Sequence, residues 1–174
     1  MEYFEIVDKN GNIIGKASRQ ECHSNPELLH RVSHILVFNS KKELYLQKRS
    51  IHKDIQPGKW DTSVGGHLNP GEIHEHAAYR ELAEELGITG VTLIYLYDYI
   101  WRSERETELV RTFKVVYDGK IVFQREEIEE GRFFSLEEIQ SAIQSNTFTP
   151  NFIEEFNRFQ KWEKSNNSNC SATD

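Results

Sequence analysis

The sequence predicts a single mixed α/β domain, and three features support this prediction. The chain has 174 residues, which suits one domain with a sizeable core. Hydrophobic residues make up 37% of it and charged residues 28%, as in a globular protein rather than a disordered or membrane one. Runs rich in β-branched and aromatic residues occur on both sides of one strongly helical segment. We see no internal repeat and no linker.

The N-terminal half reads as two hairpins. The alternating segment 3–18 contains Asn10-Gly11, a pair that favours the left-handed turn of a tight hairpin. Two apolar, strand-like runs follow at residues 31–40 and 43–50, with a short polar turn between them. We therefore expect at least four strands before the first long helix.

The middle of the chain predicts a loop, a helix and two more strands. Residues 50–64 carry proline and glycine and are expected to form the loop. Residues 74–86 are rich in Ala, Leu and Glu, and Gly87 is a natural C-terminal stop for a helix. The β-branched and aromatic segments 91–101 and 109–119 are typical of strands.

Two helices are expected near the C-terminus. Ser135 and Glu138 form a capping box at the start of the first, and Pro150 suits the first turn of the second. The packing face of the second helix is formed by Phe152, Phe156 and Phe159. The residues after Trp162 are polar and low in complexity. We therefore predict one domain over residues 1–163 and a disordered tail over residues 164–174.

Charge and composition exclude several classes of function. The net charge of −7 disfavours binding to a nucleic-acid polymer, which depends on an excess of Lys and Arg. No apolar run approaches the roughly 20 residues that span a bilayer, and the acidic start does not resemble a signal peptide. Two cysteines are too few for a disulfide framework. A cytoplasmic protein that acts on small molecules is the expectation.

Three carboxylates gather on the predicted central helix. At about 100° per residue, Glu81, Glu84 and Glu85 fall within an arc of roughly 100° beside the apolar face that carries Leu82. Such oxygen ligands select hard cations such as Mg²⁺ or Mn²⁺, which bind a few carboxylates together with substrate phosphates. Arg80 could hold one carboxylate bidentately. The alternative is a solvated, glutamate-rich helix face.

The spacing of this segment resembles the signature of the Nudix hydrolase family. The matching positions are Gly66, Glu72, Arg80, Glu81, Leu82, Glu84, Glu85, Gly87 and Ile88. The resemblance implies a Nudix-type α/β/α sandwich with a mixed sheet and, ahead of it, the N-terminal hairpin. It also implies a hydrolase that acts on acid anhydrides, cleaving a diphosphate linkage in a nucleoside diphosphate derivative or a related small molecule.

The same resemblance implies roles for individual residues. Glu81, Glu84 and Glu85 would hold divalent metal, with Mg²⁺ expected and Mn²⁺ also suited. Glu72 and Arg80 would support this site, and the backbone of Gly66 would approach it closely. Which glutamate acts as the general base stays open.

The flanking residues look like the branch of the family that contains type I isopentenyl diphosphate isomerase. The similarity runs from about Phe4 to Glu108. The positions that match a histidine and carboxylate metal site in the isomerase are His23, His30, His67, Glu106 and Glu108. Arg49 and Lys53 match residues that grip the diphosphate.

Two departures favour a hydrolase over an isomerase. Gly65 stands where the isomerase has its catalytic cysteine, and the Nudix carboxylates that isomerases lose are intact here. We expect a hydrolase on an isomerase-like scaffold that takes a small phosphorylated substrate. The alternatives are an isopentenyl diphosphate isomerase-type enzyme and a sensor that binds a nucleotide derivative without turnover.

Several residues have simpler interpretations beside the functional ones. The matched histidines could be ordinary hydrogen-bonded residues, and Arg49 and Lys53 could be solvated cations. The remaining histidines, expected to be at the surface or structural, are His34, His52, His74 and His76. The aromatic residues Trp60, Tyr95, Tyr97 and Tyr99 are expected to pack rather than to stack on a base. The hairpin and the aromatic strands could supply a homodimer surface.

Overall fold

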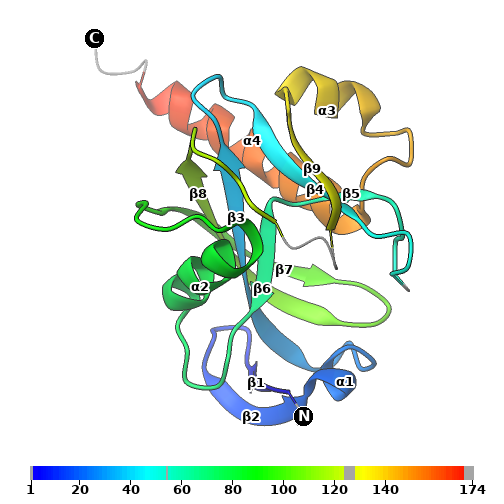
Figure 1. Cartoon of the computed structure of the whole chain (residues 1–174). Coiled ribbons are helices and arrows are strands. Elements are labelled where there is room, and N and C mark those ends of the chain that lie inside the picture. The colour runs from blue at the N-terminus through cyan, green and yellow to red at the C-terminus, as the bar shows by residue number, and fades with distance from the viewer. Residues whose placement is uncertain (1, 54, 124–127, 171–174) are drawn as a thin grey trace.

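The computed structural model describes residues 2–53, 55–123 and 128–170, and Figure 1 shows the arrangement of its elements. The strands are β1 (Tyr3–Val7), β2 (Ile13–Ser18), β3 (Leu29–Phe38), β4 (Leu44–Arg49), β5 (Trp60–Asp61), β6 (Val64–His67), β7 (Ile94–Arg102), β8 (Thr107–Val116) and β9 (Ile128–Phe134). The helices are α1 (Arg19–Cys22), α2 (His74–Leu86), α3 (Leu136–Ala142) and α4 (Pro150–Cys170). Across these described residues, no helix combines the length and the apolar character needed to cross a membrane.

Strand β3 is the centre of a mixed sheet. It pairs antiparallel with β1, β4 and β6, and parallel with β8, which in turn pairs antiparallel with β7. Strands β5 and β9 both pair with β4. The described residues of β3 and β4 pair at one position, Phe38 with Leu44, next to the turn that joins the two strands. The two strands therefore diverge, and residues of β4 and of β6, which pairs with β3, line a cleft.

Side chains that alternate along β3 enter two different core clusters. Ile35 and Val37 pack with Leu82 of α2, whereas Leu36 and Phe38 pack with Phe156 of α4. Because neighbouring residues of a strand point to opposite faces, α2 and α4 cover opposite faces of the sheet. The layered arrangement in Figure 1 thus confirms the predicted α/β/α sandwich.

The predicted N-terminal hairpin is present and joins the main sheet. Asp8 closes its turn by accepting hydrogen bonds from the backbone N–H groups of Asn10 and Asn12, at 2.8 and 3.0 Å. Gly11 adopts a left-handed φ of 83° there, as the Asn-Gly pair predicted. On β1, Ile6 pairs with His30 of β3, so the hairpin reaches the start of the central strand.

The helices begin where the sequence predicted them. Helix α2 spans the predicted residues, and Gly87 ends it in the left-handed conformation, with φ of 66°. The Ser135 side chain caps α3 by accepting from the N–H of Glu138, and α4 begins at Pro150. The predicted packing face of α4 is buried at Phe152, Phe156 and Phe159.

The C-terminal segment differs from the expectation of disorder after residue 163. Helix α4 continues to Cys170, and the remaining residues of the predicted tail, 171–174, lie outside the described part. Extending an existing helix adds one hydrogen bond for each residue fixed, so polar residues can follow a well-packed segment. The Ser165 hydroxyl and the Asn166 amide also donate to backbone carbonyls four residues earlier, each at 3.0 Å.

Packing under α2 provides the first test. Leu82 is fully buried between α2 and the sheet. We expect Leu82→Ala to lower the free energy of unfolding by about 2–5 kcal/mol, because it leaves a cavity in a close-packed core. Urea denaturation followed by circular dichroism would measure the change. Glu75→Ala, on the exposed side of the same helix, is the control and should cost much less. Equal costs for the two variants would contradict the packing described here.

Candidate active site

Gly66 and Glu81 bring strand β6 and helix α2 into direct contact. Gly66 pairs with Ser33 of β3, and a Cβ atom added to it would lie 2.1 Å from Cγ and Cδ of Glu81. No side chain fits in that space, so a glycine is needed for Glu81 to lie against the strand. This is the close backbone approach that the motif predicted for Gly66.

Arg80 connects the helix to the loop before it. Its Nε and Nη2 donate to the two carboxylate oxygens of Glu72, at 3.0 and 2.9 Å. Its Nη1 donates to Oε1 of Glu81 at 2.6 Å, and Nη2 also donates to the carbonyl of His67 at 3.0 Å. The bidentate contact expected of Arg80 is therefore made to Glu72. This hydrogen bond lowers the pKa of Glu72, and Glu72 raises the pKa of Arg80.

The three helix carboxylates differ in their environments. Glu81 is mostly buried, and its burial raises its pKa against the opposing effect of Arg80, while the negative charges of Glu84 and Glu72 also raise it. The side chain of Glu84 is 58% exposed and lies 3.4 Å from Arg80. Glu85 accepts a hydrogen bond from the Gln47 amide of β4 at 2.9 Å. A cation placed beside Glu81 would stabilise its ionised form against burial, which is the main cause of the raised pKa, and against the repulsion from Glu84 and Glu72.

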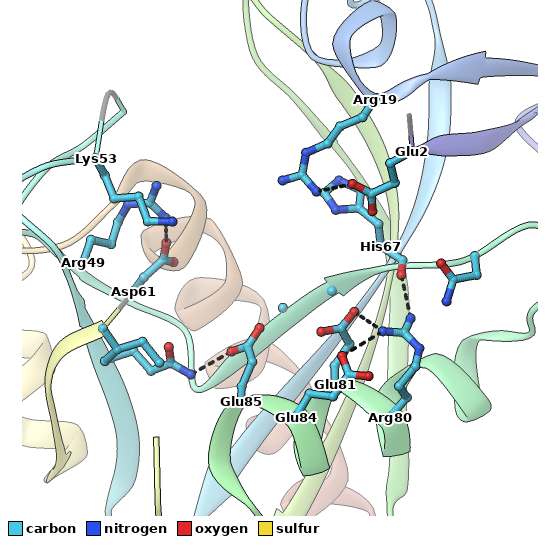
Figure 2. Close-up of a pocket in the computed structure, with 15 residues that line it drawn as sticks. Glu2, Arg19, Arg49, Lys53, Asp61, His67, Arg80, Glu81, Glu84 and Glu85 are labelled. Carbon is cyan, nitrogen blue, oxygen red and sulfur yellow. Dashed lines mark hydrogen bonds and ion pairs between the residues drawn. The ribbon is translucent and has the colours of Figure 1, made fainter. Parts of the chain in front are cut away.

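These carboxylates line a cleft of about 570 Å³, a volume in the usual range for small-molecule sites. Figure 2 shows Glu81, Glu84 and Glu85 along its lower side and Arg49, Lys53 and Asp61 on the opposite wall. Arg49 is held by Oδ2 of Asp61 at 3.2 Å and by the carbonyl of Ile55 at 3.1 Å. Glu2 and Arg19 from the N-terminal region form an ion pair of 3.0 Å at the upper side.

The histidines and carboxylates matched to the second metal set also converge. Nε2 of His23 lies 3.2 Å from Nε2 of His67 and 3.4 Å from Oε2 of Glu106. Oε1 of Glu108 lies 3.7 Å from Nε2 of His67 and 3.9 Å from Nε2 of His30. Two ligands bound about 2.1 Å from one metal are about 3.0–3.5 Å apart, so this spacing is close to that of a metal site.

The surroundings of this cluster keep its histidines neutral. Phe4 stacks on His67, with ring centroids 4.3 Å apart and planes 4° apart, and covers His30 in the same way at 5.4 Å. Burial lowers the pKa of His23 to about 4 and the pKa of His67 well below its ordinary value. Burial and Glu106 raise the pKa of Glu108 to about 7. Nε2 of His30 is buried and has no hydrogen-bond partner among the described residues.

The two candidate metal sites therefore differ in how complete they are. Within the described residues, the ligand sets whose atoms lie within 4.8 Å of one another are His23, His30 and His67, and His30, Glu106 and Glu108. The α2 carboxylates do not form such a set. This suits Mg²⁺, which commonly takes one or two carboxylates and completes its shell with water and substrate phosphates. The buried lone nitrogen of His30 suits a metal that accepts imidazole.

The burial of the remaining aromatic and histidine side chains tests what the sequence predicted for them. Trp60 and Tyr99 pack in the core as expected, whereas Tyr95 is 53% exposed. His52 and His76 are exposed. His74 is buried against the Ser33 hydroxyl, with 3.2 Å between Nδ1 and Oγ.

The cleft residues that sequence reasoning missed include Glu2, Arg19, Gln47 and Asp61. Gln47 and Asp61 carried a signal, because each is a polar residue within or beside an apolar strand. Glu2 and Arg19 carried none, since their position depends on how the hairpin joins the sheet.

Comparisons with known proteins agree with this fold. The NUDIX domain family matches residues 28–156. An uncharacterized Nudix hydrolase of Yersinia pestis is 33% identical over 153 residues, covering 88% of this chain and 82% of that protein. Isopentenyl-diphosphate Delta-isomerase 1 of Photorhabdus laumondii is 32% identical over 152 residues, covering 84% and 86%.

Solved structures show the same fold. A crystal structure from Deinococcus radiodurans superimposes with a TM-score of 0.79 at 22% identity, covering 90% of this chain and 98% of that one. The MutT protein of Methanosarcina mazei gives a TM-score of 0.66 at 25% identity, covering 82% and 96%. The chain therefore belongs to the Nudix family, as a Nudix hydrolase related to the isopentenyl diphosphate isomerases.

The contact between Arg80 and Glu72 provides the second test. A double-mutant cycle of Arg80→Gln and Glu72→Gln should give a coupling free energy of about 1–3 kcal/mol at pH 7, since charge-assisted bidentate pairs are strong. The folded state lowers the pKa of Glu72, so this stabilisation is present above about pH 4.5 and is lost as the pH falls through the folded pKa. Urea denaturation at several pH values would measure it. A coupling near zero at pH 7 would rule out this contact as an organiser of the loop.

Proposed function

We propose that this protein is a cytoplasmic, divalent-metal-dependent hydrolase that cleaves a diphosphate linkage in a nucleoside diphosphate derivative or a related small phosphorylated molecule. The observation that carries the proposal is the pairing of opposite charges across one cleft. Carboxylates of α2 lie on one side, and the cations Arg49 and Lys53 lie on the other. A diphosphate needs both, because its oxygens are neutralised by metal and by basic side chains.

The residues divide into three roles in this proposal. Glu81, Glu84 and Glu85 hold Mg²⁺, or Mn²⁺, through oxygen ligands. Arg80 and Glu72 fix the position of Glu81 and of the loop after β6. When bound, the cation supplies charge neutralisation and a more acidic water.

The substrate contacts come from the other wall and from β6. Arg49 and Lys53 donate to phosphate oxygens, and Asp61 holds Arg49 in place for this contact. The missing side chain at Gly66 lets Glu81 lie against β6, so the backbone of Gly66 is close to the proposed metal and its phosphate ligand. A carboxylate of the site accepts the proton of the attacking water. Attack on phosphorus then depends mainly on positioning.

We also propose that His23, His30, His67, Glu106 and Glu108 hold a second divalent cation. The support is the convergence of their ligand atoms and the unpartnered, buried Nε2 of His30. Imidazole together with carboxylate suits Mn²⁺ or Zn²⁺ better than Mg²⁺. His67 also lines the cleft, so this cation would lie near the substrate.

Two other activities remain distinguishable by assay. The similarity to isopentenyl diphosphate isomerases makes double-bond migration in isopentenyl diphosphate the second candidate. Gly65 counts against this activity, because it replaces the catalytic thiol of the isomerase. Binding of a nucleotide derivative without turnover is the third. A panel of diphosphate compounds with Mg²⁺ or Mn²⁺, analysed by mass spectrometry, separates the three. It should include nucleotide sugars, ADP-ribose, dinucleoside polyphosphates, coenzyme A and isopentenyl diphosphate.

The hydrolase proposal predicts a large effect of Glu85→Gln. We expect turnover of the best panel substrate to fall on the order of a hundredfold or more, because the metal loses a charged ligand. Initial rates at saturating metal would measure the change. Glu75→Gln removes one charge from the exposed face of the same helix and should keep the parent rate. Parent-like turnover in Glu85→Gln would refute this placement of the metal.

The second cation predicts pH-dependent affinity. Glu108 has a pKa of about 7 without metal and must lose its proton to become a ligand, so affinity should fall by up to tenfold for each pH unit below about 7. His23, with a pKa of about 4, adds no competition between pH 6 and pH 8. Mn²⁺ or Zn²⁺ titration by calorimetry over that pH range would show the slope.

Two variants separate this site from adventitious binding. Glu108→Gln should weaken the metal and flatten the pH dependence. Glu104→Gln changes an exposed carboxylate of the neighbouring turn and should do neither. Metal binding that is unchanged in Glu108→Gln would exclude this cluster as the second site.

A further inference from the structure

Glu155 of α4 is a fully buried carboxylate surrounded by hydrogen-bond donors. Its oxygens accept from the hydroxyls of Tyr97 at 2.6 Å, Tyr99 at 2.7 Å and Thr112 at 3.0 Å. Nδ1 of His34 on β3 lies 2.7 Å from Oε2. Four donors around one acid stabilise its ionised form, and although burial opposes this, the pKa of Glu155 is lowered.

A buried carboxylate needs a countercharge, and His34 is the group in position to supply it. An unpaired ion in the interior costs several kcal/mol, whereas a hydrogen-bonded ion pair avoids much of that cost. Burial alone would lower the pKa of His34, but the hydrogen bond and charge of Glu155 outweigh it and raise the pKa. The raised pKa favours an imidazolium, which would donate through Nδ1 to Glu155. Its second donor, Nε2–H, is left for another partner.

Nε2 of His34 points toward Gly65 at the floor of the cleft. The two residues are paired across β3 and β6, and Gly65 is exposed where it lines the cleft. A Cβ atom added to Gly65 would lie 3.3 Å from Nε2 and 3.2 Å from Cδ2 of His34, with Thr62 next at 3.6 Å. Both contacts would be tight for a Cβ atom, so a side chain at residue 65 would press on the His34 ring, whereas glycine leaves Nε2 within reach of a group that lies over Gly65.

The neighbouring glycine shows that this space is specific to Gly65. The equivalent point at Gly66, on the opposite face of β6, is filled by Glu81 at 2.1 Å. Consecutive residues of β6 thus face different groups. Gly66 faces the proposed metal ligand, and Gly65 faces a cationic hydrogen-bond donor.

We propose that His34 is a substrate-contacting residue whose Nε2–H donates to a phosphate oxygen of the substrate that lies over Gly65, where no side chain intervenes. The inference rests on the proposed function, since it assumes that the cleft binds a diphosphate. Glu155, with its tyrosine and threonine partners, is a positioning residue that keeps His34 charged and oriented. The subsite accepts hydrogen-bond acceptors and disfavours cations and donor groups.

The direct test places a methyl group between the cleft and His34. In Gly65→Ala the backbone can accept the side chain, because φ at this residue is not left-handed, and the new Cβ atom would press on the His34 ring at 3.2 Å. We expect kcat/KM for the panel substrate to fall roughly tenfold to a hundredfold, the effect of losing one charge-assisted hydrogen bond. Gly15→Ala is the matched control, a strand glycine outside the cleft whose added Cβ would meet Ile6 at an ordinary 3.9 Å. Both variants should remain folded in thermal unfolding, and Mn²⁺ affinity should be unchanged in both.

A second pair of variants separates the two nitrogens of His34. His34→Asn keeps a donor near Nδ1 for Glu155 but cannot reach Gly65, so it should lose as much kcat/KM as Gly65→Ala. His34→Gln places its amide near Nε2 and should retain more activity, if it folds. Should neither variant fold, Gly65→Ala and the binding measurement below decide the proposal.

Binding of methylenediphosphonate, a non-hydrolysable diphosphate, with Mg²⁺ tests the contact without turnover. In protein labelled with ¹⁵N-histidine and ¹⁵N-arginine, the Nε2 signal of His34 should shift on binding, and Gly65→Ala should abolish this shift. Binding that moves the Arg49 signal but not His34 would overturn the inference and leave the hydrolase proposal intact. A His34 shift with no hydrolysis of any panel compound would uphold the contact and reject the hydrolase. Absence of binding would overturn both.

Discussion

Strand β3 is buried on both faces, so each polar side chain that it carries must find a partner inside the protein. Three such residues, His30, Ser33 and His34, are fully or almost fully buried. Ser33 bonds His74 and anchors the start of α2. His34 bonds Glu155 of α4. His30 lies among the other candidate metal ligands with a free nitrogen. The cost of burying polar groups thus connects this strand to one helix on each face and to the histidine cluster.

Strand β6 connects the buried residues of β3 to the cleft, because it pairs with β3 and its residues line the cleft. Pairing with β3 sets its register, and its alternation directs Gly65 toward His34 and Gly66 toward Glu81. His67 connects the two candidate metal sites, because its carbonyl accepts from Arg80 and its imidazole lies beside His23. A one-residue shift in this register would exchange the faces and separate every one of these contacts. Glycine is needed at residue 66, where a Cβ atom would clash with Glu81 at 2.1 Å, whereas a Cβ atom at residue 65 would only press on His34 at 3.2 Å.

Much of this could be predicted from the sequence, and the reasons are local. Helix α2 was predictable because its composition, its periodicity and Gly87 agree on the same boundaries. The Nudix spacing identified Arg80 and the carboxylates of α2. Disorder was expected after residue 163, but helix α4 continues to Cys170. Composition alone does not predict that a well-packed helix can extend into polar residues.

The residues that sequence reasoning undervalued all depend on contacts distant in the chain. His34 and Glu155 are 121 positions apart, and each looked like an isolated polar residue. A common signal was nevertheless present. His34 interrupts an apolar strand, and Glu155 lies on the helix that carries the apolar stripe of Phe152, Phe156 and Phe159. Two charged residues buried in apolar surfaces must find each other or some other compensation. Opposite charges on two predicted core faces therefore indicate a buried ion pair. Because His34 of this pair lies next to Gly65 of the cleft, we propose that it also supplies an oriented donor to the substrate.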